Sequence, residues 1–80
     1  MTMTTAPLHW MSDDVSWWTP LDEDNCRFVI HREHLFSITR YWLERVQYNR
    51  ANRFKREVIR QLHGIKDLDE AKRIAAEDWS

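Results

Sequence analysis

The arginines in the second half of the chain are the residues whose type and spacing best suit a chemical role. Arg53, Arg56 and Arg60 follow one another at steps of three and four residues, and Asn49 and Asn52 precede them at similar steps. On a helix, side chains with this spacing share one face. A guanidinium group binds a carboxylate or phosphate through two parallel N–H donors. The spacing therefore predicts a surface that binds negative charge.

The distribution of charge along the chain supports this hypothesis. Residues 40–66 carry eight basic and two acidic side chains, whereas residues 1–39 carry two and six, and residues 67–80 carry two and five. The net charge of −1 thus conceals a basic centre between two acidic ends. Two interpretations stay open. Either the arginines contact another molecule, or the chain's own carboxylates neutralise them, beginning with the nearby Glu57.

Tryptophan supplies a second candidate contact. Trp17 and Trp18 are neighbours on a predicted strand, so their side chains point to opposite faces and one of them is left near the surface. Exposed tryptophan is common at binding hot spots, although a small domain can instead bury all of its aromatic side chains in its core. The predicted partner-binding residues are Arg45, Asn49, Arg50, Asn52, Arg53, Arg56, Arg60 and Trp18.

The residues typical of catalysis and metal binding do not occur in useful patterns. No serine lies in a G-x-S-x-G motif, the single Cys26 has no basic neighbourhood built for it, and one glycine cannot form a phosphate-binding loop. His31 and His34 supply two metal ligands without a third, and the acidic run 22–24 is typical of a solvated turn. We expect no enzymatic activity, no cofactor and no bound metal.

The first elements that must position these residues are an arm and a hairpin. Residues 1–12 are predicted to be a flexible N-terminal arm, followed by a single domain over residues 13–80. Residues 15–19 and 26–30 alternate between apolar and polar side chains on either side of an acidic turn, which is typical of a β-hairpin. A hairpin alone is barely stable in water, so it must pack on the segments that follow.

Helical periodicity is the dominant pattern after residue 31. Apolar residues at steps of three and four predict helices over residues 32–48 and 51–63, with a break near 47–52. The alternative is one continuous helix that buries both of its apolar stripes by dimerising. Gly64 is placed to end the second helix, and Asp67 with Glu70 forms a capping pattern for a third helix over residues 68–78. The expected fold is a helix-dominated β-β-α-α-α domain of the α+β class, with an N-terminal β-hairpin packed on two to three α-helices.

Composition and patterning together favour a binding protein. No apolar run reaches the length of a membrane span, and a lone cysteine without a secretion signal is typical of a reducing compartment, so we expect a cytoplasmic protein without membrane contact. We expect a non-enzymatic protein-interaction module that binds a partner with an acidic surface through the basic helix face and a surface tryptophan. Small charge-segregated domains of this kind serve as accessory, regulatory or inhibitory subunits, including phage-type inhibitors of host nucleoprotein complexes. The alternatives are a nucleic-acid-binding protein that uses the same arginines and a small homodimeric helical scaffold.

Overall fold

Valine, isoleucine, threonine and aromatic side chains are frequent in residues 26–48, and these residue types favour an extended, pleated backbone. In a computed structural model, which describes residues 8–52 and 54–79, this stretch forms strands β3 (Cys26–Leu35) and β4 (Ile38–Tyr48). The two strands pair antiparallel from Cys26 opposite Gln47 to Leu35 opposite Ile38. They are joined by a two-residue turn, in which Phe36 takes a positive φ of 60°.

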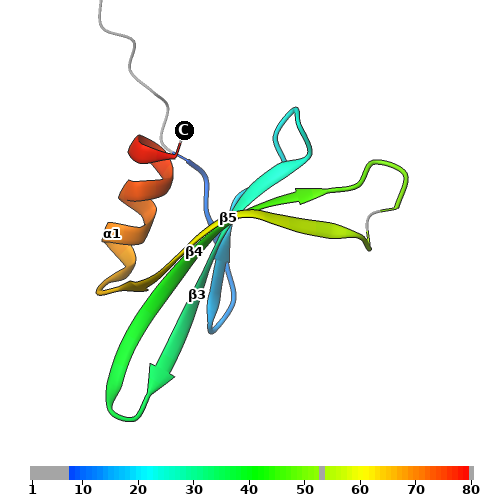
Figure 1. The fold of residues 1–80 in the computed structure, drawn as a ribbon. Helices are drawn as coiled ribbons and strands as arrows, with labels where there is room; N and C mark the ends of the chain where they lie inside the picture. The colour runs from blue at the N-terminus through cyan, green and yellow to red at the C-terminus, as the bar shows by residue number, and fades with distance from the viewer. Residues whose placement is uncertain (1–7, 53, 80) are drawn as a thin grey trace, which may run out of the picture.

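Three further strands complete a single antiparallel sheet. β1 (Met11–Ser12) and β2 (Ser16–Trp18) precede β3, and β5 (Arg56–Ile65) follows β4. The spatial order β1-β2-β3-β4-β5 equals the order in the chain, so the described strands form a simple meander (Figure 1). The strands at the two edges differ greatly in length, because β1 has two residues and β5 has ten.

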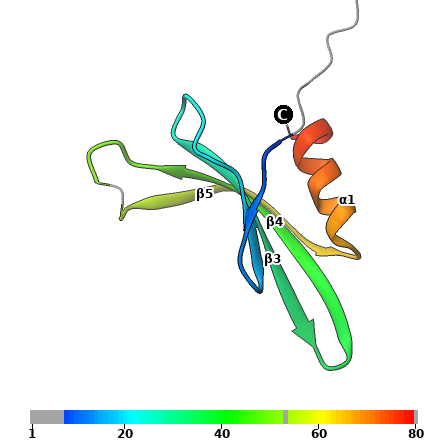
Figure 2. The same cartoon turned by 180° about the vertical axis from the view of Figure 1, so that it is seen from behind.

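Among the described residues, a single helical segment covers one face of this sheet. It consists of the α-helix α1 (Leu68–Arg73), which continues as a short π-helix, η1 (Ile74–Asp78). Figure 2 shows this segment on one side of the sheet, with no helix on the opposite side. The core lies between sheet and helix, where apolar side chains from both remove each other from water. Its buried members are Phe28, Ile30, Leu43, Ile65, Ala71, Ile74 and Ala75.

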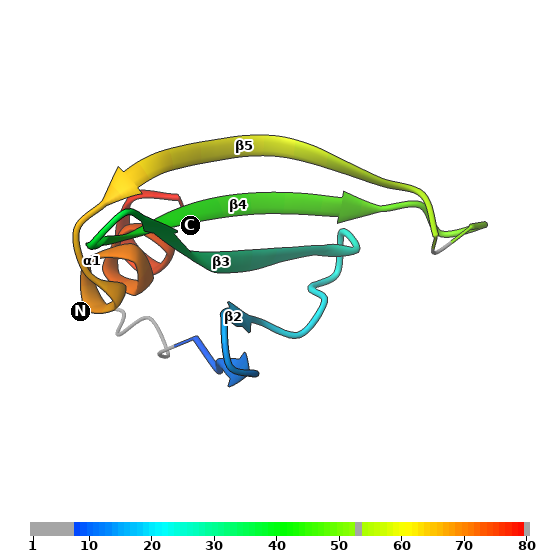
Figure 3. The ribbon, with the colours of Figure 1, turned by 90° about the horizontal axis from the view of Figure 1, so that it is seen from below.

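The helix is shorter than the sheet, so it covers only part of the face on which it packs. Figure 3 shows α1 beneath the end of the sheet where β5 finishes, whereas the hairpin between β4 and β5 extends away from it. The molecule is accordingly flat, with extents of 40 × 39 × 20 Å. None of its described helices is long and apolar enough to cross a membrane.

The predicted helix-dominated fold is wrong. Residues 32–48 and 51–63 do not form helices; they belong mainly to β3, β4 and β5, and no β-hairpin packs on two to three helices. The alternative of one long helix is wrong for the same reason. A step of four residues keeps side chains on one face of a strand as well as of a helix, since four is a multiple of the strand period of two. Trp42 and Val46 therefore share a face of β4 although their spacing suggested a helix.

Two irregularities in the pairing of β4 with β5 strengthen the false helical signal. The register shifts between Tyr41 and Leu43, and again between Arg45 and Val46. Each shift adds a residue to β5 and brings side chains three positions apart onto one face. Leu62 and Ile65 are such a pair, because they lie opposite Leu43 and Tyr41. The shift between Tyr41 and Leu43 thus produced one of the apolar three-residue steps that are typical of a helix.

Two local predictions are confirmed by the structure. The expected helix over residues 68–78 is present, and the side chain of Asp67 accepts a 2.7 Å hydrogen bond from the backbone N–H of Glu70. The two N-terminal runs pair as β2 and β3. Of the predicted N-terminal arm, residues 1–7 lie outside the described residues, whereas Leu8 and Trp10 pack against the core.

Candidate functional site

The hairpin that joins β4 to β5 carries most of the predicted binding residues, and we call residues 48–56 the basic hairpin. Its loop is held by its own asparagines. The side-chain oxygen of Asn49 accepts hydrogen bonds from the backbone N–H groups of Ala51 and Asn52, at 2.8 and 3.0 Å. The side-chain oxygen of Asn52 accepts one from Phe54 at 3.1 Å. Such Asx turns fix a loop without large apolar side chains, so both asparagines have a structural role here.

Cations and one aromatic ring are exposed on the basic hairpin. The guanidinium group of Arg50 donates to the backbone carbonyl of Glu23 at 3.1 Å, and it forms no ion pair with a described carboxylate. Lys55 and Arg56 are exposed, and neither forms an ion pair within the described part of the chain. In the loop that connects β4 to β5, the side chain of Phe54 is 99% exposed. Arg53 lies outside the described residues.

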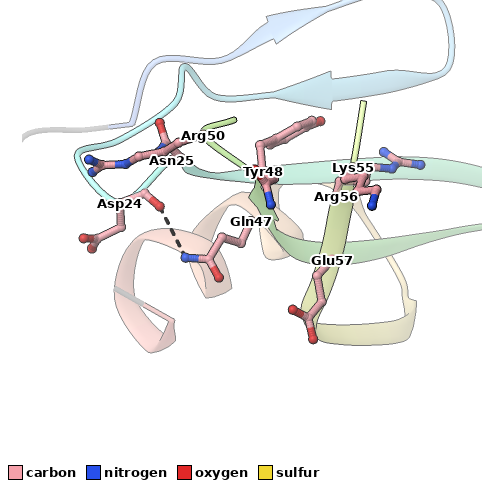
Figure 4. A pocket seen from close by; sticks show the side chains of 9 residues that line it. Asp24, Asn25, Gln47, Tyr48, Arg50, Lys55, Arg56 and Glu57 are labelled. Atoms are coloured by element: carbon pink, nitrogen blue, oxygen red, sulfur yellow. Dashed lines mark hydrogen bonds between the residues drawn. The ribbon is translucent and has the colours of Figure 1, made fainter. Parts of the chain in front are cut away.

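An open depression of about 430 Å³ lies at the base of the basic hairpin. Figure 4 shows Arg50 on one side, with Lys55 and Arg56 on the other, and Tyr48 between them. Two carboxylates, Asp24 and Glu57, also line it. The depression is polar and open to solvent, so it suits a charged group of another molecule better than a buried apolar ligand.

Two of the predicted arginines are held against the chain's own side chains. Arg45 forms a 2.6 Å ion pair with Asp22, and its guanidinium lies 4.5 Å from the centre of the Phe28 ring. Arg60 lies 4.5 Å from the centre of a ring of Trp79 in the C-terminal segment. Cation–π contacts and ion pairs of this kind hold a side chain in place. These arginines therefore contribute to the structure of the domain as well as to its charge.

The electrostatic surroundings of Asp22 stabilise its ion pair with Arg45. Burial works to raise the pKa of the carboxyl. Hydrogen bonds from the backbone N–H groups of Cys26 and Asp24 and from Arg45 outweigh that effect, so the pKa lies below its ordinary value. The charged form is therefore the one that the fold stabilises. Asp22 connects the acidic turn before β3 to β4, directly beside the basic hairpin.

The predicted basic helix is wrong, because its arginines lie on a strand and its loop. Successive positions of a strand point to opposite faces. Arg56 lies opposite Tyr48 on the face without the helix, whereas Arg60 lies opposite Arg45 on the face that the helix covers. Trp18 is half-buried on β2, and β3 separates it from β4 and the basic hairpin. The structure thus brings Arg50 and Arg56 together at the hairpin but places Arg60 and Trp18 elsewhere.

Two exposed phenylalanines were missed by the sequence analysis. Phe36, at the turn between β3 and β4, and Phe54 are both essentially fully exposed. Phe54 had a recognisable signal, since it stands between Arg53 and Lys55 in a basic run, and an aromatic residue within such a run is typical of a contact surface. Phe36 had none, because its turn lacks the Gly or Asn that usually indicates a hairpin.

The remaining chemically active side chains are placed as structural groups. Burial raises the pKa of the Cys26 thiol, which disfavours the nucleophilic thiolate. Within residues 8–52 and 54–79, no cluster of three or more histidine, cysteine, aspartate or glutamate side chains is arranged to hold a metal ion.

The fold and the site together describe a small antiparallel meander with one covering helix and a projecting basic hairpin. Comparisons with protein-family models, curated proteins and solved structures give no match. The function is therefore argued from this chain's own geometry.

Proposed function

We propose that this chain is a non-enzymatic protein-interaction module whose basic hairpin docks on an acidic surface of a partner protein. The observation that carries the proposal is the exposed Phe54 beside Lys55 and Arg56, whose charges have no carboxylate partner within the described residues. A large aromatic ring with adjacent cations is the composition typical of a binding hot spot. An accessory, regulatory or inhibitory role, as in a phage-type inhibitor of a nucleoprotein complex, would use such a surface.

The rigidity of the loop supports the same function. The Asx bonds of Asn49 and Asn52 and the 3.0 Å backbone bond from Asn49 N–H to the Lys55 carbonyl fix the described residues of the hairpin loop. Ordering a loop on binding costs free energy, so a loop that is already ordered binds more tightly for the same contacts. The ordered hairpin can therefore present Phe54 without a large entropic cost.

Charge reversal in the hairpin tests this proposal. Lys55→Glu and Phe54→Ala should each weaken capture of a partner from the native source at least tenfold, an effect of about 1.4 kcal/mol or more. Lys66→Glu is the matched control, since it makes the same change in charge just after β5, away from the hairpin. Equal recovery of the same partner by Lys55→Glu and Lys66→Glu would show that the basic hairpin is the wrong surface.

A nucleic acid is the second candidate, and the same ring favours it. An exposed aromatic side chain among cations can stack on a base while the cations neutralise phosphates. Fluorescence anisotropy with a duplex and a single-stranded oligonucleotide separates the two functions. Binding that falls steeply with salt and is lost in Lys55→Glu, but not in Lys66→Glu, would replace the protein partner with a nucleic acid.

A further inference from the structure

β5 is a long strand whose outer side is unpaired. It is the last strand in the sheet, and no described strand or helix lies along its outer edge (Figure 3). Alternate residues along its length therefore present backbone N–H and C=O groups that have no partner in the sheet. The opposite edge, β1, is only two residues long and offers little for another strand to pair with.

β5 is only partly protected against pairing with another strand. Edge strands are commonly protected by proline, by charged side chains, by β-bulges or by a covering segment, and of these β5 has charges and two bulges. β5 contains no proline, and three of its apolar side chains are exposed: Val58 at 42%, Ile59 at 49% and Leu62 at 42%. They are three of the nine large apolar side chains that are exposed among the described residues, and a strand that paired here would cover part of their surface.

A bulge gives β5 an arrangement of charges that complements itself. Arg45 lies opposite Arg60 and Val46 lies opposite Val58, so Ile59 is the additional residue. As a result Glu57 and Arg60, three positions apart, both lie on the face that carries the helix. One acidic and one basic side chain therefore stand on the same face, on either side of the midpoint between Val58 and Ile59.

We propose that two copies of this chain associate through β5, antiparallel, about a two-fold axis between Val58 and Ile59. In this arrangement Glu57 of each copy lies opposite Arg60 of the other. The Arg60 guanidinium lies over Trp79 of its own chain and can still donate through its in-plane N–H groups, and the two-fold symmetry forms the pair twice. Side chains directly opposite one another in an antiparallel pair have Cβ atoms about 5 Å apart, which suits ion pairing. The same pairing places the exposed Val58 beside Ile59 of the second copy. The two sheets become one continuous sheet.

A second copy fits this edge better than an unrelated strand for two reasons. The charges of β5 match the same segment when it runs in the opposite direction, which an arbitrary sequence would not do. The domain is also small, and an 80-residue chain buries a modest fraction of its surface on folding, so association through an apolar edge adds stability. The paired segment ends before Phe54, so the exposed ring of the basic hairpin stays outside the dimer interface, whereas Arg56 and Glu57 belong both to β5 and to the depression at the base of the hairpin.

Measurement of mass against concentration tests the proposal. Sedimentation velocity on the full chain should show a dimer that dissociates on dilution. Glu57→Arg and Arg60→Glu each put like charges opposite one another at two symmetric positions, and each should raise the dimer dissociation constant about tenfold or more. Combining the two substitutions in one chain, or mixing the two single variants, restores opposite charges and should restore the dimer.

Controls distinguish loss of the interface from loss of the fold. Asp14→Arg makes the same charge change as Glu57→Arg at the far edge of the sheet, and it should leave the dimer unchanged. Circular dichroism checks that each variant keeps its sheet. A chain that stays monomeric up to millimolar concentration overturns the proposal. So does a dimer that ignores the single substitutions, or a double variant that remains as weak as the single ones.

Discussion

Arg45 on β4 and Asp22 in the turn before β3 form a 2.6 Å ion pair between residues that are 23 positions apart in the chain. The pair joins the acidic N-terminal part of the chain to its basic centre. Asp22 also accepts backbone hydrogen bonds from Asp24 and Cys26, at 2.8 and 3.0 Å, which close the turn. The charge separation seen along the sequence is thus partly neutralised within the fold, and Arg50, Lys55 and Arg56 of the basic hairpin are among the cations that form no ion pair within the described residues.

Asp22→Asn should lower the free energy of unfolding by about 1 kcal/mol at neutral pH, because the amide loses the charge-assisted bond to Arg45 on a partly exposed surface. The fold lowers the pKa of Asp22, so its contribution is present above the pKa of the unfolded chain and disappears as the pH falls through the folded-state pKa. Urea titrations of both proteins should therefore converge in acid. A difference that grows as the pH falls would contradict this assignment.

Ile30→Ala should lower the free energy of unfolding by about 3 kcal/mol, since Ile30 is fully buried between the sheet and the helix and leaves a cavity. Ile59→Ala is the matched control, because Ile59 is 49% exposed on β5 and its loss should cost well under half as much. Chemical denaturation monitored by tryptophan fluorescence measures both at a concentration where the chain is monomeric. Similar losses at the two positions would argue against this core.

Asp67→Ala should lower the free energy of unfolding by about 1 kcal/mol, because the Asp67 side chain caps α1 by accepting a hydrogen bond from the backbone N–H of Glu70. The neighbouring Asp69→Ala removes a charge from the same turn but no cap, so it should cost only a few tenths of a kcal/mol. Thermal unfolding followed by circular dichroism compares the two. An equal effect would mean that charge, and not the capping bond, stabilises this end of the helix.

Phe36→Gly should keep or raise stability, by up to about 1 kcal/mol, since a bulky residue at φ 60° is strained and Phe36 is fully exposed. Phe54→Gly is the control, because Phe54 is equally exposed but is not among the described residues with positive φ. Phe54→Gly should lower the free energy of unfolding by about 0.5 kcal/mol, because glycine adds conformational freedom to the unfolded chain. Equilibrium unfolding in urea distinguishes the two. A marked loss of stability in Phe36→Gly would show that the ring makes contacts in solution.

Local signals explain why part of the fold could be predicted. The capping pattern of Asp67 and Glu70 acts within one helical turn, and the alternation of residues 15–19 and 26–30 concerns single strands, so neighbouring residues were enough to identify them. The long strands were different. Glu44 and Arg45 occupy inner positions of β4, where Glu44 is hydrogen-bonded to His31 and Arg45 forms an ion pair with Asp22. These charged residues interrupted the apolar alternation that would have indicated a strand.

The candidate site was predicted in its composition but not in its geometry. Arg50 and Arg56 lie together at the basic hairpin, yet Arg60 lies on the other face of the sheet and Arg45 is held by Asp22. Helical spacing placed all of them in one row, whereas a strand with a bulge distributes them over two faces. Only the exposed phenylalanine between basic residues could have identified the hairpin tip directly.

The sequence by itself determined the charge segregation, the C-terminal helix and its cap, because each depends on residues that are neighbours in the chain. Only the tertiary structure decided that the centre of the chain forms three long strands, which cations stay unpaired and which edge stays open. Those properties depend on pairing between distant segments and on two bulges that change which face a side chain occupies. Apolar residues four positions apart share one face of a strand as well as of a helix, so their spacing alone does not distinguish the two. Contacts across the sheet therefore decided that these segments form strands.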